Sequence, residues 1–228
     1  MIHYGLWMDA SLPGLSIVVL GRSSAGSWSV MSEYHDNTLG ASNQINSILN
    51  SMLHKLGVKP AQIEYLAVGN GPGSFTGIKV AMAWAYGFFC IEAPMFVSGF
   101  SALWLGCLGI QKEKSQVLLK VTSSHGFFAK SSLQGYSEFP FERSEFKTIL
   151  EDGDIYLASH WPEMEFDLNQ AGVPYVALES LRSHAVLGLL ATLNQPDFEW
   201  KTEFPSPRYL KLSTAEEKLI KNQESFLG

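Results

Sequence analysis

The sequence predicts an α/β fold, and two observations lead to this prediction. The first hundred residues alternate short strand patterns with two longer helical patterns, in the order strand–strand–strand–helix–strand–helix. Apolar residues make up 46% and charged residues 17% of the 228 residues, so the chain can build a sizeable core. The length allows one large domain or two small ones.

Three short strands are expected at the start of the chain, over residues 2–8, 14–19 and 27–33. Each is a short apolar run, and clusters of turn-forming residues rich in glycine, serine and proline separate one run from the next. Strands joined by such tight turns form a β-meander.

A helix is predicted over residues 42–56, with Ser42 as its N-cap and Gly57 as its C-cap. Its apolar residues recur at helical spacing along one face, and its other face is polar but almost uncharged. The apolar residues are Ile45, Ile48, Leu49, Met52, Leu53 and Leu56.

A second helix, over residues 78–89, is apolar on nearly every side. Such a helix is either an ordinary buried helix or one that another protein chain covers, and the pattern leaves both interpretations open. One set of positions carries only small residues, which let another helix approach closely: Ala81, Ala83, Ala85 and Gly87.

A glycine-rich turn joins a buried strand over residues 63–68 to this second helix. Ser74 or Thr76 can cap the helix, and the turn is either a structural corner or a ligand-binding loop. Its spacing fits neither the Walker A loop, nor the dinucleotide fingerprint, nor the nucleophile elbow. The motif residues are Gly71, Pro72, Gly73, Ser74, Phe75, Thr76 and Gly77.

This motif closely resembles the signature of the bacterial TsaB (YeaZ) family. Residues 8–11 (Met-Asp-Ala-Ser) resemble the turn after that family's first strand, and residues 94–101 resemble its strand that starts at a proline and ends at a serine. Residues 207–211 (Pro-Arg-Tyr-Leu-Lys) resemble its C-terminal motif. The resemblance is close over residues 1–108 and thin between about 122 and 200.

The resemblance implies an actin/Hsp70/sugar-kinase (ASKHA) fold with two βββαβα-type half-domains, the second reduced. We therefore expect half-domains over residues 1–108 and 109–228. The expected elements of the second half are strands over 117–121, 126–133, 154–158 and 175–178, and a helix over 181–193.

The resemblance also implies a function. TsaB proteins are subunits of the machinery that makes N6-threonylcarbamoyladenosine at position 37 of tRNA, and they are relatives of the catalytic subunit TsaD. The implied role is non-catalytic: the chain supports a TsaD-like partner in a heterodimer, which a TsaE-like ATPase joins. The resemblance also implies a homodimer when the chain is alone. We expect the first two helices to meet the partner through Ile45, Leu49, Met52, Ala81, Trp84, Ala85 and Phe88.

The residues that hold nucleotide in this fold are largely missing. The first phosphate turn keeps Asp9 and Ser11 but places Pro13 where a backbone donor is needed, and the corresponding second turn, residues 122–126, has no carboxylate. No histidine pair has the His-x-x-x-His spacing of the TsaD metal site. We expect a vestigial phosphate turn, with no catalytic residue, cofactor or metal. The alternative is an active ATP-dependent phosphotransferase or metallopeptidase-like enzyme of the same fold.

Composition limits the other possibilities. The net charge is −6 and basic residues are spread thinly, which argues against direct nucleic-acid binding. Cys90 and Cys107 lie in apolar stretches and are expected to be buried reduced thiols of a cytoplasmic protein. No secretory signal is visible. The uncharged stretch over residues 93–110 is interrupted by Pro94, so a membrane span is disfavoured. A membrane-associated interaction protein stays as a third alternative, which predicts loss from the soluble fraction.

Overall fold

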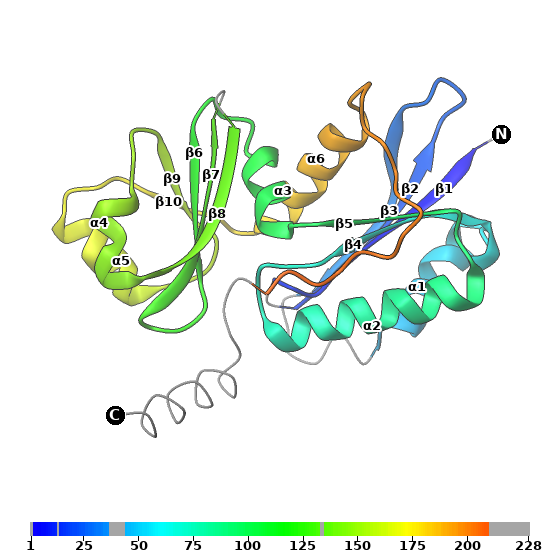
Figure 1. The fold of residues 1–228 in the computed structure, drawn as a ribbon, viewed down its shortest axis with the longest axis horizontal. Coiled ribbons are helices and arrows are strands. Elements are labelled where there is room, and N and C mark those ends of the chain that lie inside the picture. Colours follow the sequence, from blue (N-terminus) through cyan, green and yellow to red (C-terminus); the bar gives the residue numbers. More distant parts are fainter. Residues whose placement is uncertain (1, 13, 37–43, 133–134, 210–228) are drawn as a thin grey trace, which may run out of the picture.

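The computed structural model describes residues 2–12, 14–36, 44–132 and 135–209. It contains two five-stranded sheets with helices packed around them (Figure 1). The strand order of the first sheet is β3-β2-β1-β4-β5, and that of the second is β8-β7-β6-β9-β10. The second order repeats the first, strand for strand. The predicted α/β fold with two related halves, the ASKHA fold, is therefore confirmed.

The first half contains every element that the sequence predicted there. Strands β1, β2 and β3 form the antiparallel meander, and β4 and β5 extend the sheet in parallel with β1. Its elements are β1 (His3–Asp9), β2 (Leu15–Arg22), β3 (Trp28–Asp36), α1 (Ile45–Leu56), the short η2 (Pro60–Gln62), β4 (Ile63–Gly69), α2 (Phe75–Glu92), β5 (Phe96–Phe100) and α3 (Ala102–Gly109). Gly57 ends α1 with φ +66°, as predicted, while Ser42 lies outside the described residues.

The second half confirms the predicted strands and the last helix, and adds elements that the sequence did not predict. Its elements are β6 (Ser115–Lys120), β7 (His125–Ser132), β8 (Gly135–Glu142), η3 (Arg143–Glu145), α4 (Phe146–Ile149), β9 (Asp154–Leu157), α5 (Pro162–Gln170), β10 (Val176–Ala177) and α6 (Leu181–Leu193). Strand β8 is at the edge of its sheet and contains Pro140, which weakens a strand signal. Helix α5 buries only Met164 and Leu168, so its apolar pattern is too short to predict a helix from the sequence.

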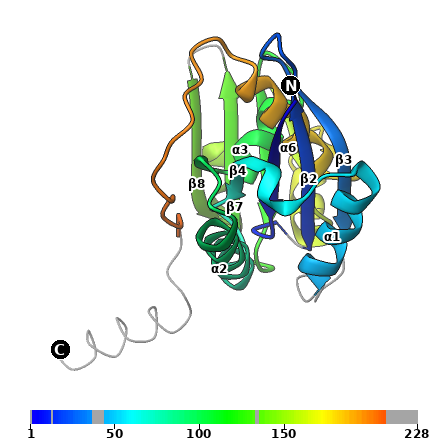
Figure 2. The same cartoon turned by 90° about the vertical axis from the view of Figure 1, so that its right-hand side faces the viewer.

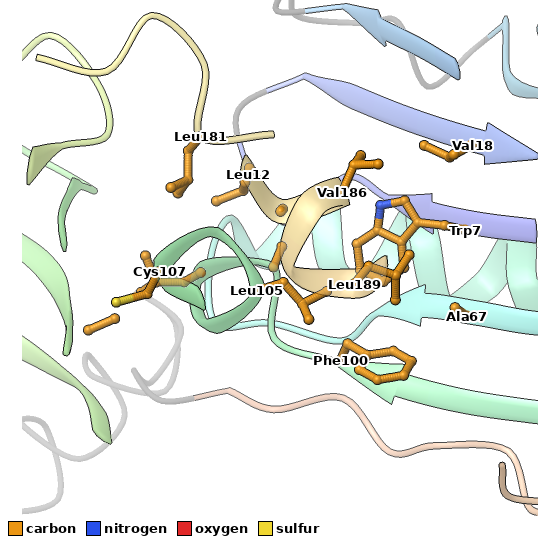
Figure 3. Close-up of a cluster of buried hydrophobic side chains, with 14 of the residues drawn as sticks. Trp7, Leu12, Val18, Ala67, Phe100, Leu105, Cys107, Leu181, Val186 and Leu189 are labelled. Carbon is orange, nitrogen blue, oxygen red and sulfur yellow. The ribbon is translucent and has the colours of Figure 1, made fainter. Parts of the chain in front are cut away.

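The helices and sheets are layered, because successive strand residues point to opposite faces of a sheet. Leu6 and Met8 of β1 pack with α1 and α2 on one face. Trp7, between them in sequence, points to the other face, where α3 and α6 lie between the two sheets (Figures 1 and 3). The far face of the second sheet is covered by α4 and α5. The middle layer is therefore shared by both halves.

Helices α3 and α6 touch through their backbones. A Cβ atom on Gly109 would lie 1.7 Å from the carbonyl oxygen of His184, and one on Gly188 would lie 1.9 Å from that of Leu105. Glycine at both positions allows this close crossing. The crossing joins the first half to the helix that ends the second half.

After α6 the chain returns to the first half. The side chain of Asn194 bonds to the backbone of Trp28 at both its N–H (2.7 Å) and its carbonyl oxygen (3.2 Å), and Lys201 pairs with Val97 of β5. Figure 1 shows this segment in orange, running past β5 toward the first turn of α2. The end of the described chain therefore packs against the first sheet.

No helix among the described residues has both the length and the apolar character needed to cross a membrane. Cys107 is buried, as predicted, but the prediction for Cys90 was wrong, because its side chain is exposed on α2.

Candidate functional site

The glycine motif packs tightly against the turn that follows β1. The N–H of Ser74 donates to the carbonyl oxygen of Ser11 at 2.7 Å. A Cβ atom on Gly73 would lie 2.2 Å from that oxygen, and one on Gly77 would lie 1.8 Å from the carbonyl oxygen of Ala10. The two segments leave no room for a side chain between them, so this geometry favours the structural corner over the ligand loop.

The motif also sets the start of α2. Gly71 has φ +101°, in the region that favours glycine, and the Gly71–Pro72 peptide bond is cis. The Ser74 hydroxyl accepts from the N–H of Gly77 at 3.2 Å and caps the helix. Of the two predicted caps, Ser74 is therefore the one used, and Thr76 is exposed.

Asp9, the predicted remnant of the first phosphate turn, is buried and bonded within its own turn. Its Oδ1 accepts from the N–H of Ser11 at 3.0 Å and from the Ser11 hydroxyl at 2.5 Å. Burial raises the pKa of Asp9, while the bonds from Ser11 and the charge of Arg182 lower it. A Cβ atom on Gly69 would lie 1.9 Å from Oδ1, so only glycine there leaves space for the carboxylate. Pro13 lies outside the described residues.

The turn at residues 122–126, which was compared above with the second phosphate turn of the fold, is closed by its own hydrogen bonds. The Thr122 hydroxyl accepts from the N–H groups of Ser124 (3.3 Å) and His125 (3.0 Å), and the indole of Trp161 donates to the carbonyl oxygen of Ser123 at 3.2 Å. The backbone N–H groups of Ser124 and His125 are therefore already hydrogen-bonded within the turn, and they do not point to a bound phosphate. Across the described residues, no three His, Cys, Asp or Glu side chains form a group that could hold a metal ion.

A cavity of about 370 Å³ lies between the two halves. Its first-half wall is Leu12, and its second-half walls include Leu119, Leu178 and Leu181. Arg182, also at the cavity, donates to the carbonyl oxygens of Asp36 at 2.9 Å and Leu12 at 3.2 Å. This buried guanidinium joins α6 to the first half, and burial lowers its pKa.

The predicted partner-contact residues need correction. Five of the seven lie in this chain's own core, between α1, α2 and the first sheet, so they cannot meet a partner in the folded chain: Ile45, Leu49, Met52, Ala81 and Ala85. The other two, Trp84 and Phe88, are half-buried and stack with their ring centroids 5.2 Å apart. The error arises because a core-facing and a partner-facing stripe have the same helical spacing.

The exposed side of α2 carries a different set of residues. We call Ala83, Tyr86, Cys90 and Ile91 the α2 outer face; all four are exposed, Tyr86 by 55% and Ile91 by 79%. None of the four is charged; Lys79, which is also exposed, lies one helical turn before Ala83 on the same side of α2. A helix that buries one face needs only one apolar stripe, whereas α2 is apolar on nearly every side. The apolar residues outside its buried stripe are the sequence signal that points to this exposed face.

The chain is similar to known proteins both in sequence, over residues 40–90, and in fold, over nearly its whole length. A family model described as "TsaD: tRNA N6-adenosine threonylcarbamoyltransferase" matches residues 40–90, which include α1, β4, the glycine motif and most of α2. The structure of YeaZ from Pseudomonas aeruginosa superposes with a TM-score of 0.67 at 17% identity, covering 91% of this chain and 99% of that one. The chain has the YeaZ fold.

A second solved structure agrees. It is described as an uncharacterized protein with similarity to the peptidase YeaZ from Pseudomonas aeruginosa, and it matches with a TM-score of 0.62 at 17% identity, again covering 91% of this chain and 99% of that one. No curated protein sequence matches the chain significantly. The resemblance to the TsaB (YeaZ) family is thus confirmed by a TsaD-family match across the glycine motif and by the YeaZ fold across nearly the whole chain.

Proposed function

We propose that this chain is a non-catalytic, TsaB-type subunit of the complex that makes N6-threonylcarbamoyladenosine at position 37 of tRNA. In this proposal it binds a TsaD-like subunit and supports that subunit's activity. The main supporting observation is the uncharged, exposed α2 outer face on a YeaZ fold. Exposed apolar surface on a helix is a common sign of a protein partner.

The closed phosphate turns support the non-catalytic part of the proposal. Asp9 is bonded within its own turn, and the backbone donors of the second turn bond to Thr122. In the proposed role, the glycine motif is a rigid corner that fixes the start of α2, and thereby the direction of its outer face. The chain then needs no cofactor of its own.

The proposed assembly has three kinds of subunit. A TsaD-like paralogue covers the α2 outer face, and a TsaE-like ATPase joins the pair. Without the paralogue, the same face allows two copies of the chain to pair. We place this assembly in the cytoplasm. The net charge of −6 disfavours direct binding of the chain to tRNA, so in this proposal the partner subunit makes the contact with tRNA.

Tyr86→Glu should abolish capture of the host's TsaD-like subunit by the tagged chain. The change places a carboxylate in the middle of the proposed interface, where it would be desolvated without a partner charge. Phe166→Glu on α5 is the matched control, because Phe166 is also an exposed aromatic (61%) but lies on the far helix layer. Pull-down with both folded variants is the measurement. If Tyr86→Glu captures the partner as well as Phe166→Glu does, the face is not the interface.

The isolated chain should bind Mg-ATP weakly or not at all. The reason is that the carboxylate of Asp9 is buried within its turn and the residues 122–126 offer none. Isothermal titration calorimetry with Mg-ATP checks this, together with an assay of ATP turnover. Micromolar affinity or turnover would favour the alternative, an active enzyme of the same fold.

A further inference from the structure

Residues 207–209, the described part of the C-terminal motif, make contacts that the proposed function leaves unexplained. We call residues 205–209 the strap. The backbone N–H of Arg208 donates to the carbonyl oxygen of Asn70 at 2.7 Å, and the side-chain amide of Asn70 donates to the carbonyl oxygen of Ser206 at 3.0 Å. The ring of Tyr209 packs on Phe75 at 4.9 Å. The strap thus bonds to the residue just before the glycine motif and packs on Phe75 within it.

The same strap reaches the second half. The Arg208 guanidinium forms an ion pair with Glu138 of β8 at 2.6 Å. Glu138 Oε2 also accepts from the hydroxyl of Ser101, the N-cap of α3, at 2.5 Å. The carboxylate of Glu138 therefore joins an edge strand of the second sheet to the glycine corner and to α3. In Figure 1 the orange segment ends beside the first turn of α2, and in Figure 2 it runs down the same side of the molecule as α2.

The two partners of this ion pair differ in burial, and this difference determines what breaking the pair would cost. The Glu138 side chain is only 2% exposed, whereas that of Arg208 is 43% exposed. A buried carboxylate that loses its cation is costly, so the pair is favoured in the closed arrangement. The neighbouring Tyr136 shows how strongly this environment resists negative charge: burial and the Glu138 carboxylate together raise its pKa. Because Arg208 is partly in solvent, it can leave the pair without crossing the core.

We propose that the strap is a releasable latch. Paired with Glu138, Arg208 holds the two half-domains and the glycine corner in one relative orientation; when the pair opens, the halves can rotate about the α3–α6 crossing and the cavity between them can widen. The inference does not depend on the proposed function, because it concerns motion within this chain alone.

The test measures the distance between the two halves in the full chain. Spin labels at Lys55→Cys on α1 and Asn169→Cys on α5, two exposed positions, report this distance in a Cys90→Ser background. Wild type should give one narrow distance distribution. Arg208→Met and Glu138→Gln should each broaden it or add a second distance. Lys130→Met, which removes an ion pair with Glu151 on the surface of the second half, should leave it narrow.

Hydrogen exchange provides an independent readout of the same variants. Amides of residues 70–75 and of β8 should exchange faster by about tenfold or more in Arg208→Met and in Glu138→Gln, but not in Lys130→Met. The double variant should exchange no faster than the single variants, because both act through one pair. If Arg208→Met does not fold, Glu138→Gln decides, since it removes the buried charge. A narrow distance distribution in either folded variant, or additive effects in the double variant, would overturn the latch.

Discussion

Gly77→Ala is expected to destabilise the protein by about 1–3 kcal/mol or more, although it adds a single methyl group in a helix. The added Cβ would lie 1.8 Å from the carbonyl oxygen of Ala10, which belongs to the backbone and has little freedom to move. The glycine corner and the turn after β1 would have to separate. Urea denaturation of purified protein measures the loss.

Gly87→Ala is the matched control on the same helix. No atom lies within 4 Å of a Cβ built on Gly87. Alanine is also the better helix former, so this variant should be more stable than wild type by about 0.5–1 kcal/mol. If Gly77→Ala proved as stable as Gly87→Ala, the corner would not be as closely packed as described.

Ala85→Glu is expected to unfold the protein or to lose about 4 kcal/mol or more. Ala85 is 0% exposed and packs with the core between α2 and the first sheet, so the carboxylate would be buried with no partner. Soluble yield and the midpoint of thermal unfolding are the measurements.

Ala83→Glu, two residues earlier on α2, is the control. Ala83 is exposed, so the free energy of unfolding of the Ala83→Glu protein should stay within about 0.5 kcal/mol of the wild-type value. A stably folded Ala85→Glu protein would mean that the helix presents a different face to the core. This pair of variants therefore tests the corrected orientation of α2.

Local sequence patterns predicted much of the fold. The last helix was predicted over residues 181–193, the bounds that α6 has in the structure. Its apolar positions are a signal within one segment, and in the structure the Ser180 hydroxyl caps the helix by accepting from the N–H of Ser183. Strand β8 was missed because an edge strand with half-exposed residues lacks a clear alternation. Its existence depends on pairing with β7, which is a tertiary contact.

The candidate site was harder to predict for the same reason. The corner role of the glycine motif depends on the backbone of Ala10 and Ser11, more than sixty residues away in sequence. Which side of α2 faces the sheet depends on the other elements, because nearly all of its sides are apolar. The pair of Glu138 with Arg208 joins residues seventy positions apart, and neither residue type is unusual in its segment. Contacts of this kind leave little trace in a single sequence.

We propose that the chain supports threonylcarbamoyladenosine formation in tRNA without catalysing it. The most direct test of this role is to deplete the chain in its host and to quantify this nucleoside in tRNA digests by mass spectrometry, with wild-type, Tyr86→Glu or Phe166→Glu protein restored. We expect the nucleoside to fall on depletion and to recover with wild type and Phe166→Glu but not with Tyr86→Glu. An unchanged level of the nucleoside after depletion would contradict this proposed role.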